Sequence, residues 1–127
     1  MRIKNLPLSS GAQVFKALSE ESRIRILHLL LKTEELCITD IERVLDFTQA
    51  KTSRHLSYLK NSGIVSSKKM DQWNFYFIKE EISDFVAQAL EYLNRDHLLR
   101  QDLESYRDLY NGGELAVFRR KARDTVR

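Results

Sequence analysis

The side chains best suited to chemistry in this sequence lie between Thr48 and Met70, a segment that holds five basic residues and no acidic residue. In the major groove of DNA, Arg can hydrogen-bond guanine, Gln can hydrogen-bond adenine, and Ser and Thr are adaptable. Lys and Arg also bind backbone phosphates, which no carboxylate of this segment would repel. The predicted DNA-binding residues are Thr48, Gln49, Lys51, Ser53, Arg54, His55, Ser57, Lys68 and Lys69.

Two short helices in tandem are expected to position most of these side chains. A Thr-x-x-Glu capping box predicts a first helix over residues 39–46. Thr48 is the predicted cap of a second helix over residues 48–62, and Gly63 stands where a left-handed residue ends a helix. Two such helices form a helix-turn-helix, whose second helix carries the polar and basic side chains. His55 is open to two interpretations, a contact with DNA or a hydrogen bond that supports the helix.

A β-hairpin is predicted after the second helix. Strand-like runs over residues 64–69 and 74–78 are separated by a polar turn, and the second run is strongly aromatic. The hairpin brings Lys68 and Lys69 beside the helix-turn-helix, which is the arrangement of a winged helix. The predicted fold class is therefore mainly α with a small β-hairpin wing.

The chain of 127 residues fits one domain with terminal extensions. Residues 80–110 contain no Gly or Pro and keep helical spacing, so they form either one long helix or two. The net charge of +3 arises at the C-terminus, because residues 119–127 hold five basic side chains and one acidic side chain. The predicted parts are an N-terminal arm (1–10), a winged helix-turn-helix core (11–79), a dimerisation helix or helices (80–111) and a basic, flexible tail (112–127).

Three segments, ALSEESRIRILHLL, ELCITDI and TQAKTSRHLSYLKNSGIV, carry a family resemblance. Over about residues 11–95 the sequence resembles the ArsR/SmtB family of bacterial winged-helix repressors. The resemblance implies a dimeric winged helix-turn-helix that binds a pseudo-palindromic operator in double-stranded DNA as a homodimer and is released by an inducer. It also implies a dimer interface between the first and last helices. A ligand pocket between the two long helices is the alternative for the apolar stripe there. The apolar candidates for that interface are Phe15, Phe85, Leu90 and Leu93.

The metal-ligand sets of this family do not carry over. Arsenic- and lead-type members place two or more Cys in the stretch that here reads ELCITDI, whereas this sequence has only Cys37. Zinc-type members use Asp and His on the long helix with a second His further on, and here no His follows His97. We therefore predict no metal and no cofactor. Cys37 is either a buried packing residue or a redox sensor, and the inducer is a redox signal, a small molecule, a metal at an unfamiliar site, or absent.

Other classes of function fit this sequence less well. An enzyme is not expected, because no Gly-x-Gly-x-x-Gly, P-loop or His-Glu-x-x-His motif is found. No apolar run is long enough to span a membrane and the N-terminus lacks the apolar core of a signal peptide, so a cytoplasmic protein without a membrane partner is expected. The alternative function is a winged-helix dimer that binds protein, because residues 80–118 sum to −6 and would attract a basic partner.

Overall fold

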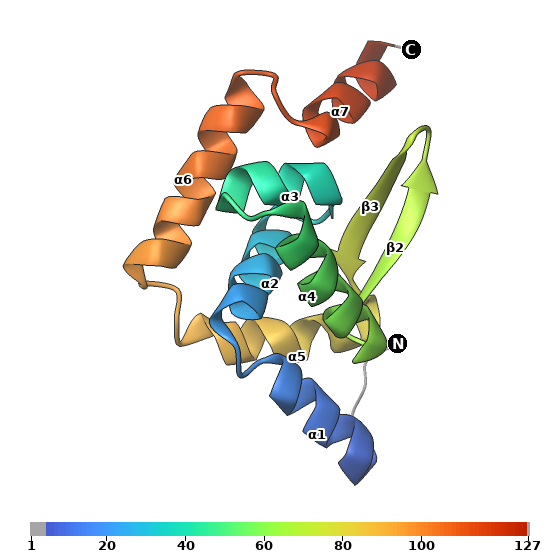
Figure 1. Cartoon of the computed structure of the whole chain (residues 1–127), viewed down its shortest axis with the longest axis vertical. Helices are drawn as coiled ribbons and strands as arrows, with labels where there is room; N and C mark the ends of the chain where they lie inside the picture. The colour runs from blue at the N-terminus through green and yellow to red at the C-terminus, as the bar shows by residue number, and fades with distance from the viewer. Residues whose placement is uncertain (1–4, 127) are drawn as a thin grey trace.

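The computed structural model describes residues 5–126, which form seven helices and one three-stranded sheet (Figure 1). The elements are α1 Leu8–Ala17, α2 Glu21–Thr33, β1 Leu36–Cys37, α3 Ile38–Leu45, α4 Gln49–Asn61, β2 Val65–Met70, β3 Trp73–Ile78, α5 Glu80–Glu91, α6 His97–Asn111 and α7 Ala116–Val126. The fold is mainly helical with a small β-hairpin wing, which confirms the predicted fold class. None of the described helices is long and apolar enough to cross a membrane.

The helix-turn-helix consists of α3 and α4, and local backbone geometry shapes their junction. Asp46 adopts a left-handed conformation with φ of 57° and ends α3. The Thr48 hydroxyl accepts a hydrogen bond of 3.1 Å from the Lys51 amide, which confirms Thr48 as the cap of α4. Gly63, with φ of 80°, follows the end of α4 as predicted.

The capping box predicted for α3 is wrong. This helix begins at Ile38, with Cys37 at the cap position and no side-chain cap. The Thr39 hydroxyl instead lies 3.1 Å from the sulfur of Cys37. Because β1 runs directly into α3, the strand fixes where the helix starts, and Thr39 falls inside the first turn instead of at the cap.

The sheet has the order β1-β3-β2 and is antiparallel throughout. The hairpin pairs Val65 with Ile78 and Met70 with Trp73, and its turn uses a positive φ of 57° at Asp71. The short strand β1 pairs with the middle of β3, at Phe75 and Tyr76, and joins the hairpin to the helical core. The wing is therefore anchored through β1, and its tip lies near α7, as Figure 1 shows.

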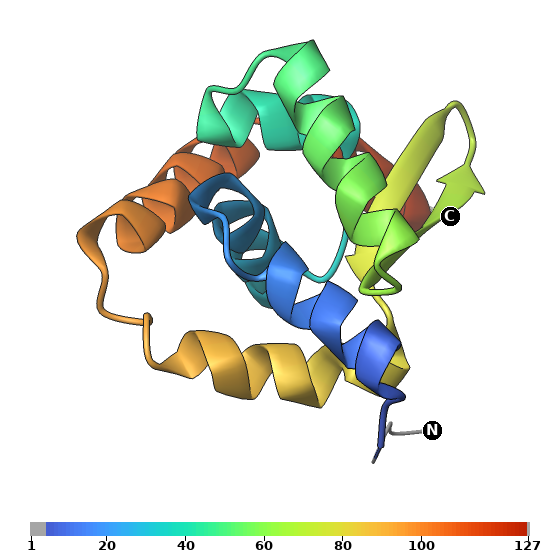
Figure 2. The same cartoon turned by 60° about the horizontal axis from the view of Figure 1, so that its bottom comes forward.

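Helix α2 is the centre of the core. Ile26, Leu27, Leu29 and Leu30 are at most 1% exposed. The helix packs against α4, α5, α6 and β3, and Figure 2 shows it enclosed by the other helices. Such a wide apolar surface on one helix requires neighbouring elements on several sides, because leaving these aliphatic side chains in water would cost free energy.

Residues 80–111, for which the sequence allowed either one helix or two, form two helices, α5 and α6. The Asp96 carboxylate caps α6, because it accepts hydrogen bonds from the amides of Leu98 (2.9 Å) and Leu99 (3.2 Å). The chain changes direction at this cap, and α6 packs against α2 and α3.

A buried ion pair joins α6 to α2. The Arg25 guanidinium donates two hydrogen bonds, of 3.0 and 2.9 Å, to the carboxylate of Asp102, which is 3% exposed. A third guanidinium contact, of 3.4 Å, reaches the Leu45 carbonyl at the end of α3, and the group lies 4.9 Å from the centre of the Phe47 ring. One arginine of α2 therefore meets both α6 and the turn before α4.

Both predicted terminal extensions differ from the structure. The predicted arm over residues 1–10 overlaps α1, which begins at Leu8. The predicted flexible tail over residues 112–127 is wrong, because most of it forms helix α7. Residues 1–4 and Arg127 lie outside the described residues.

Helix α7 is held by a carboxylate from a distant part of the chain. Leu115, Ala116 and Val117 are at most 6% exposed and pack into the core. Asp40 of α3 is buried, and its carboxylate accepts hydrogen bonds from the amides of Ala116 (2.8 Å) and Val117 (2.9 Å). A cap supplied from α3 has no local sequence signature, which explains why the helix was not predicted.

Replacing Asp40 with Ala should destabilise the fold, because the two amides of α7 would lose their acceptor. We expect Asp40→Ala to lower the free energy of unfolding, measured by urea denaturation, by about 1–3 kcal/mol. Glu42→Ala, on the same helix, is the matched control and should change that free energy by less than about 0.5 kcal/mol. Equal effects of the two substitutions would contradict the cap.

Candidate nucleic-acid interface

One face of α4 is exposed and polar, while the opposite face belongs to the core. The buried face carries Thr52, Leu56 and Leu59. The exposed face carries Gln49, Ser53, Arg54 and Ser57. Within the described part of the chain, no carboxylate forms an ion pair with Arg54. The helix therefore brings four of the predicted DNA-binding residues together on a surface beside the wing (Figure 1).

The first turn of α4 adds a positive charge to this surface. Lys51 is partly exposed, and its ammonium lies 4.2 Å from the centre of the Phe47 ring. This cation–π contact holds the ammonium near the N-terminus of α4, where the helix dipole is also positive. The Thr48 hydroxyl is already engaged as the helix cap. Both the ammonium and the free amides of this turn favour an anion such as a phosphate.

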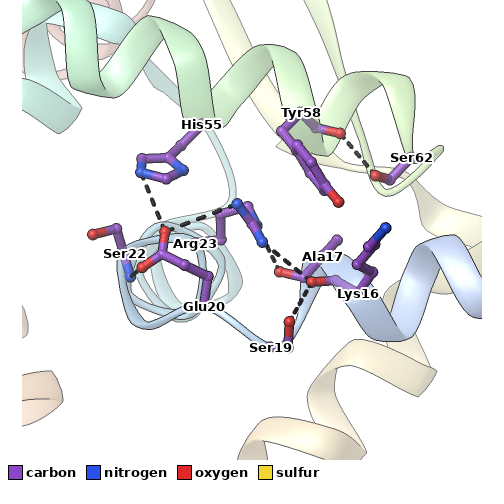
Figure 3. Close-up of polar contacts among 9 residues, drawn as sticks. All are labelled: Lys16, Ala17, Ser19, Glu20, Ser22, Arg23, His55, Tyr58 and Ser62. Atoms are coloured by element: carbon purple, nitrogen blue, oxygen red, sulfur yellow. Dashed lines mark hydrogen bonds and ion pairs between the residues drawn. The ribbon is translucent and has the colours of Figure 1, made fainter.

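His55 does not lie on the exposed face, so its predicted contact with DNA is wrong. The side chain is buried, and its Nε2 lies 3.2 Å from a carboxylate oxygen of Glu20. Figure 3 shows the imidazole pointing from α4 toward the start of α2. The other interpretation of this histidine, a hydrogen bond that supports the helix, fits this position.

The contact between His55 and Glu20 is part of a polar cluster that sequence reasoning missed (Figure 3). The Arg23 guanidinium donates hydrogen bonds to the carbonyls of Ala17 (2.9 Å) and Lys16 (3.2 Å) at the end of α1. It also lies 4.0 Å from the centre of the Tyr58 ring on α4. Arg23 therefore connects α1, α2 and α4, and it contacts α4 on the face that points into the fold. The i to i+3 spacing of Glu20 and Arg23 was visible, but their partners were not.

Burial and neighbouring charges shift the pKa values of this cluster. Burial lowers the pKa of His55, and Arg54, Arg23 and Lys51 add to this effect, while Glu20 opposes it. For Glu20, burial raises the pKa, but the hydrogen bond from the Ser22 amide and the charges of His55 and Arg23 reverse the sign, so its pKa is lowered. The pair therefore consists of a neutral imidazole and a carboxylate near neutral pH.

The two lysines of the wing differ in their surroundings. Lys69 is exposed on β2 opposite Asn74, with no acidic partner in the described part of the chain. The ammonium of Lys68 lies 2.9 Å from a carboxylate oxygen of Glu35, which also pairs with Arg120 of α7. The positive charge of Lys68 is therefore partly compensated, whereas that of Lys69 is available to a partner.

Helix α7 attaches to the turn of the wing, which the sequence did not indicate. The Arg123 guanidinium lies 2.8 Å from the carboxylate of Asp71 and 6.0 Å from the centre of the Trp73 ring. The basic run at the C-terminus was visible in the sequence, but nothing there pointed to the hairpin. The wing is therefore supported from behind by a helix, and its orientation depends on that support.

A second exposed surface lies on α1 and α5 and is apolar. Phe15 is 63% exposed and Phe85 is 38% exposed, and their rings meet edge to face at 5.8 Å between centroids. Together with Tyr92 they line a groove of about 720 Å³. Leu93 is 37% exposed, whereas Leu90 is 3% exposed and packs in the core of its own chain, so its predicted place in a dimer interface is wrong.

Comparison with known proteins decides the family. Residues 20–67 match the model of a family described as bacterial regulatory protein, arsR family. Over 79 residues the chain is 37% identical to the arsenical resistance operon repressor of Escherichia coli K12, an alignment that covers 62% of this chain and 68% of that repressor. The chain belongs to the ArsR family. This ArsR-family protein is also 41% identical over 78 residues to a cadmium resistance transcriptional regulatory protein of Listeria innocua, which covers 61% of this chain and 66% of that regulator.

A solved structure supports the same assignment. The ArsR-family protein resembles a homodimeric winged helix-turn-helix DNA-binding domain of Mycobacterium bovis, described as a possible ArsR-family transcriptional regulator. The two share 28% sequence identity with a TM-score of 0.61, and the match covers 71% of this chain and 87% of that domain. Family membership and fold together identify a DNA-binding transcription regulator.

Cys37, the candidate redox sensor, lies in the hydrophobic core of this ArsR-family protein. Cys37 is 3% exposed, and burial raises the pKa of its thiol. Both observations favour the packing interpretation over a reactive thiolate. In the described part of the chain, no three His, Cys, Asp or Glu side chains are grouped so that they could hold a metal ion.

The stability of this ArsR-family protein should decrease in mild acid, because two buried histidines have lowered pKa values. Burial and Lys32 lower the pKa of His28 against the opposing charges of Asp102 and Asp96, and the pKa of His55 is also lowered. The unfolded chain therefore binds more protons below its ordinary histidine pKa of 6.5, and the free energy of unfolding falls there.

We expect urea denaturation to give a lower free energy of unfolding at about pH 5 than at about pH 7. Above about pH 7 this free energy should no longer change through the histidines. His55→Gln should reduce this pH dependence, and His97→Gln, at an exposed position, is the control that should leave it unchanged. A pH dependence that His55→Gln leaves intact would contradict the lowered pKa of His55 as one of its sources.

Proposed function

We propose that this protein is a homodimeric repressor that inserts α4 into the major groove of a pseudo-palindromic operator. The exposed face of α4 carries the proposal, because it joins Arg54 and Gln49 with two serines and is free of carboxylates. Arg and Gln discriminate guanine and adenine through hydrogen bonds to base edges. A helix with this face exposed and its other face locked in the core is suited to reading a sequence.

The flanking groups suit the phosphate backbone. Lys51 stands at the N-terminus of α4, and Lys69 lies on the wing next to it. Phosphate contacts fix the register of a protein on the duplex, while base contacts supply the specificity. We therefore propose Lys51 and Lys69 as phosphate contacts, with Arg54, Gln49 and the serines of α4 reading the bases.

The apolar surface of α1 and α5 is the proposed dimer interface. Phe15 and Phe85 expose apolar rings that a second copy of this chain would cover. A two-fold axis there would place two copies of α4 in successive major grooves, about 34–36 Å apart. Occupying an operator in this way blocks access of RNA polymerase to the promoter, which is how the repressor would act.

Arg54→Ala tests the role of α4. We expect this substitution to weaken binding of an operator duplex, selected from a random pool, by about tenfold or more, because a base or phosphate contact is lost. Fluorescence anisotropy measures the affinity, and Arg95→Ala, an exposed arginine between α5 and α6, is the matched control. An unchanged affinity of the Arg54→Ala variant for every duplex would overturn the assignment of α4.

Phe85→Glu tests the dimer interface. Burying a carboxylate among the aromatic side chains of the interface should raise the dimer dissociation constant by about 30-fold or more, measured by sedimentation velocity. Leu98→Glu is the matched control, since Leu98 and Phe85 are both 38% exposed but Leu98 lies on α6. Equal effects of the two substitutions would place the interface elsewhere.

A further inference from the structure

A cleft of about 370 Å³ lies between α2 and α6, next to the end of α5. Its walls carry three cations, Lys32 of α2 and Arg100 and Arg107 of α6, against one carboxylate, Glu104, which leaves a formal charge of +2. Among the described residues, none of these three cations forms an ion pair. The cleft therefore concentrates uncompensated positive charge outside the DNA-binding surface.

The helical spacing of these groups makes the cleft a defined site. His28 and Lys32 are four residues apart on α2, and Arg100 and Arg107 are seven apart on α6, so each pair lies on one helix face. The two helices are locked together by the ion pair of Arg25 and Asp102. The cations are thus presented by two rigid elements, which limits the entropy lost when they bind a ligand.

His28 supplies an independent indication of a ligand. The side chain lines the cleft and is 2% exposed, and its Nδ1 makes no hydrogen bond to any described residue. Buried polar atoms in folded proteins nearly always have a partner. An acceptor oxygen in the cleft would provide one for the Nδ1–H tautomer of this imidazole.

A second cavity gives the site room for more than a single ion. It has a volume of about 460 Å³ and shares His28, Lys32 and Asn94 with the cleft. Leu31, Ala87 and Leu90 contribute apolar surface to its wall, and Asp84 and Glu91 place carboxylates there, so the positive charge is confined to the cleft along α6. The combined space is in the range of small-molecule pockets, which are commonly about 300–1,000 Å³.

We propose that the cleft between α2 and α6 binds a small molecule through an oxyanion group, a phosphate or a carboxylate. Lys32, Arg100 and Arg107 form its ionic contacts, and His28 donates a hydrogen bond to one of its oxygens. Two arginines suit such groups better than lysines alone, because a planar guanidinium can donate two parallel hydrogen bonds to two oxygens of one phosphate or carboxylate.

The site is placed to influence DNA binding, a consequence that rests on the proposed function. Helix α2 connects the cleft to α4. Lys32 of the cleft lies in its last turn, whereas Glu20 and Arg23 at its start contact α4. An anion that draws α6 toward α2 favours one arrangement of these helices over others. If only one arrangement fits the operator, the anion changes the operator affinity.

Isothermal titration calorimetry of the full-length protein in a Tris-chloride buffer tests binding directly. Inorganic phosphate and citrate are titrated separately at matched ionic strength. Binding of phosphate alone assigns a phosphate-bearing ligand, and binding of citrate alone assigns a carboxylate; either supports the site. Absence of heat from both anions up to millimolar concentrations overturns it.

Variants locate the binding. The double substitution of Arg100→Gln and Arg107→Gln should weaken anion binding by about tenfold or more, with the far-UV circular dichroism spectrum unchanged. Arg95→Gln, outside the cleft, is the matched control and should keep the affinity of the wild type. An equal affinity of the double variant and the wild type would overturn the assignment.

Two further readouts separate this inference from the proposed function. Nitrogen NMR of the His28 imidazole should show a shift on anion addition that the double variant lacks. Operator affinity is then measured with and without the anion. Failure of the wild type to bind any duplex would contradict the proposed repressor but leave the calorimetric test intact, whereas an unshifted His28 resonance would contradict the anion site.

Discussion

The apolar side chains of α2 are covered by neighbouring helices and by β3, and this burial governs the positions of the other elements. Because the helix is enclosed, the polar groups near its ends must find partners in the helices that cover it. Glu20 does so with His55 of α4, and Arg25 does so with Asp102 of α6. Hydrophobic burial thus brings the helices together without direction, and the polar contacts select one arrangement among those that burial alone would allow.

The orientation of α4 follows from this arrangement. Successive residues of an α-helix are separated by about 100° around its axis, so His55 and Arg54 cannot both face the core. Burial of His55 against Glu20 therefore turns Arg54 outward. The contact of Arg23 with Tyr58 adds a second restraint one turn further along the same helix. His55, which does not contact DNA in the proposed complex, thereby determines which side chains of α4 face the DNA.

Local patterns in the sequence were sufficient for the helix-turn-helix, the hairpin and the cap at Thr48, because caps, strand alternation and helical spacing depend on residues near one another. Contacts between distant residues were not accessible in this way. The cap on α7 and the ion pair on α6 join positions more than 70 residues apart. His55 shows the same limit, since its residue type suits either a phosphate or a carboxylate and only the tertiary arrangement decides between them.

The cap that Asp40 provides to α7 also has a consequence for biosynthesis. Its two donors, the amides of Ala116 and Val117, follow it in the chain by 76 and 77 residues. During translation α3 is made long before these amides exist, so a nascent chain that folds early holds this carboxylate without its partners. The cap on α7 can form only after residues 116 and 117 have left the ribosome, so the packing of α3 against α7 is completed late in synthesis of this segment.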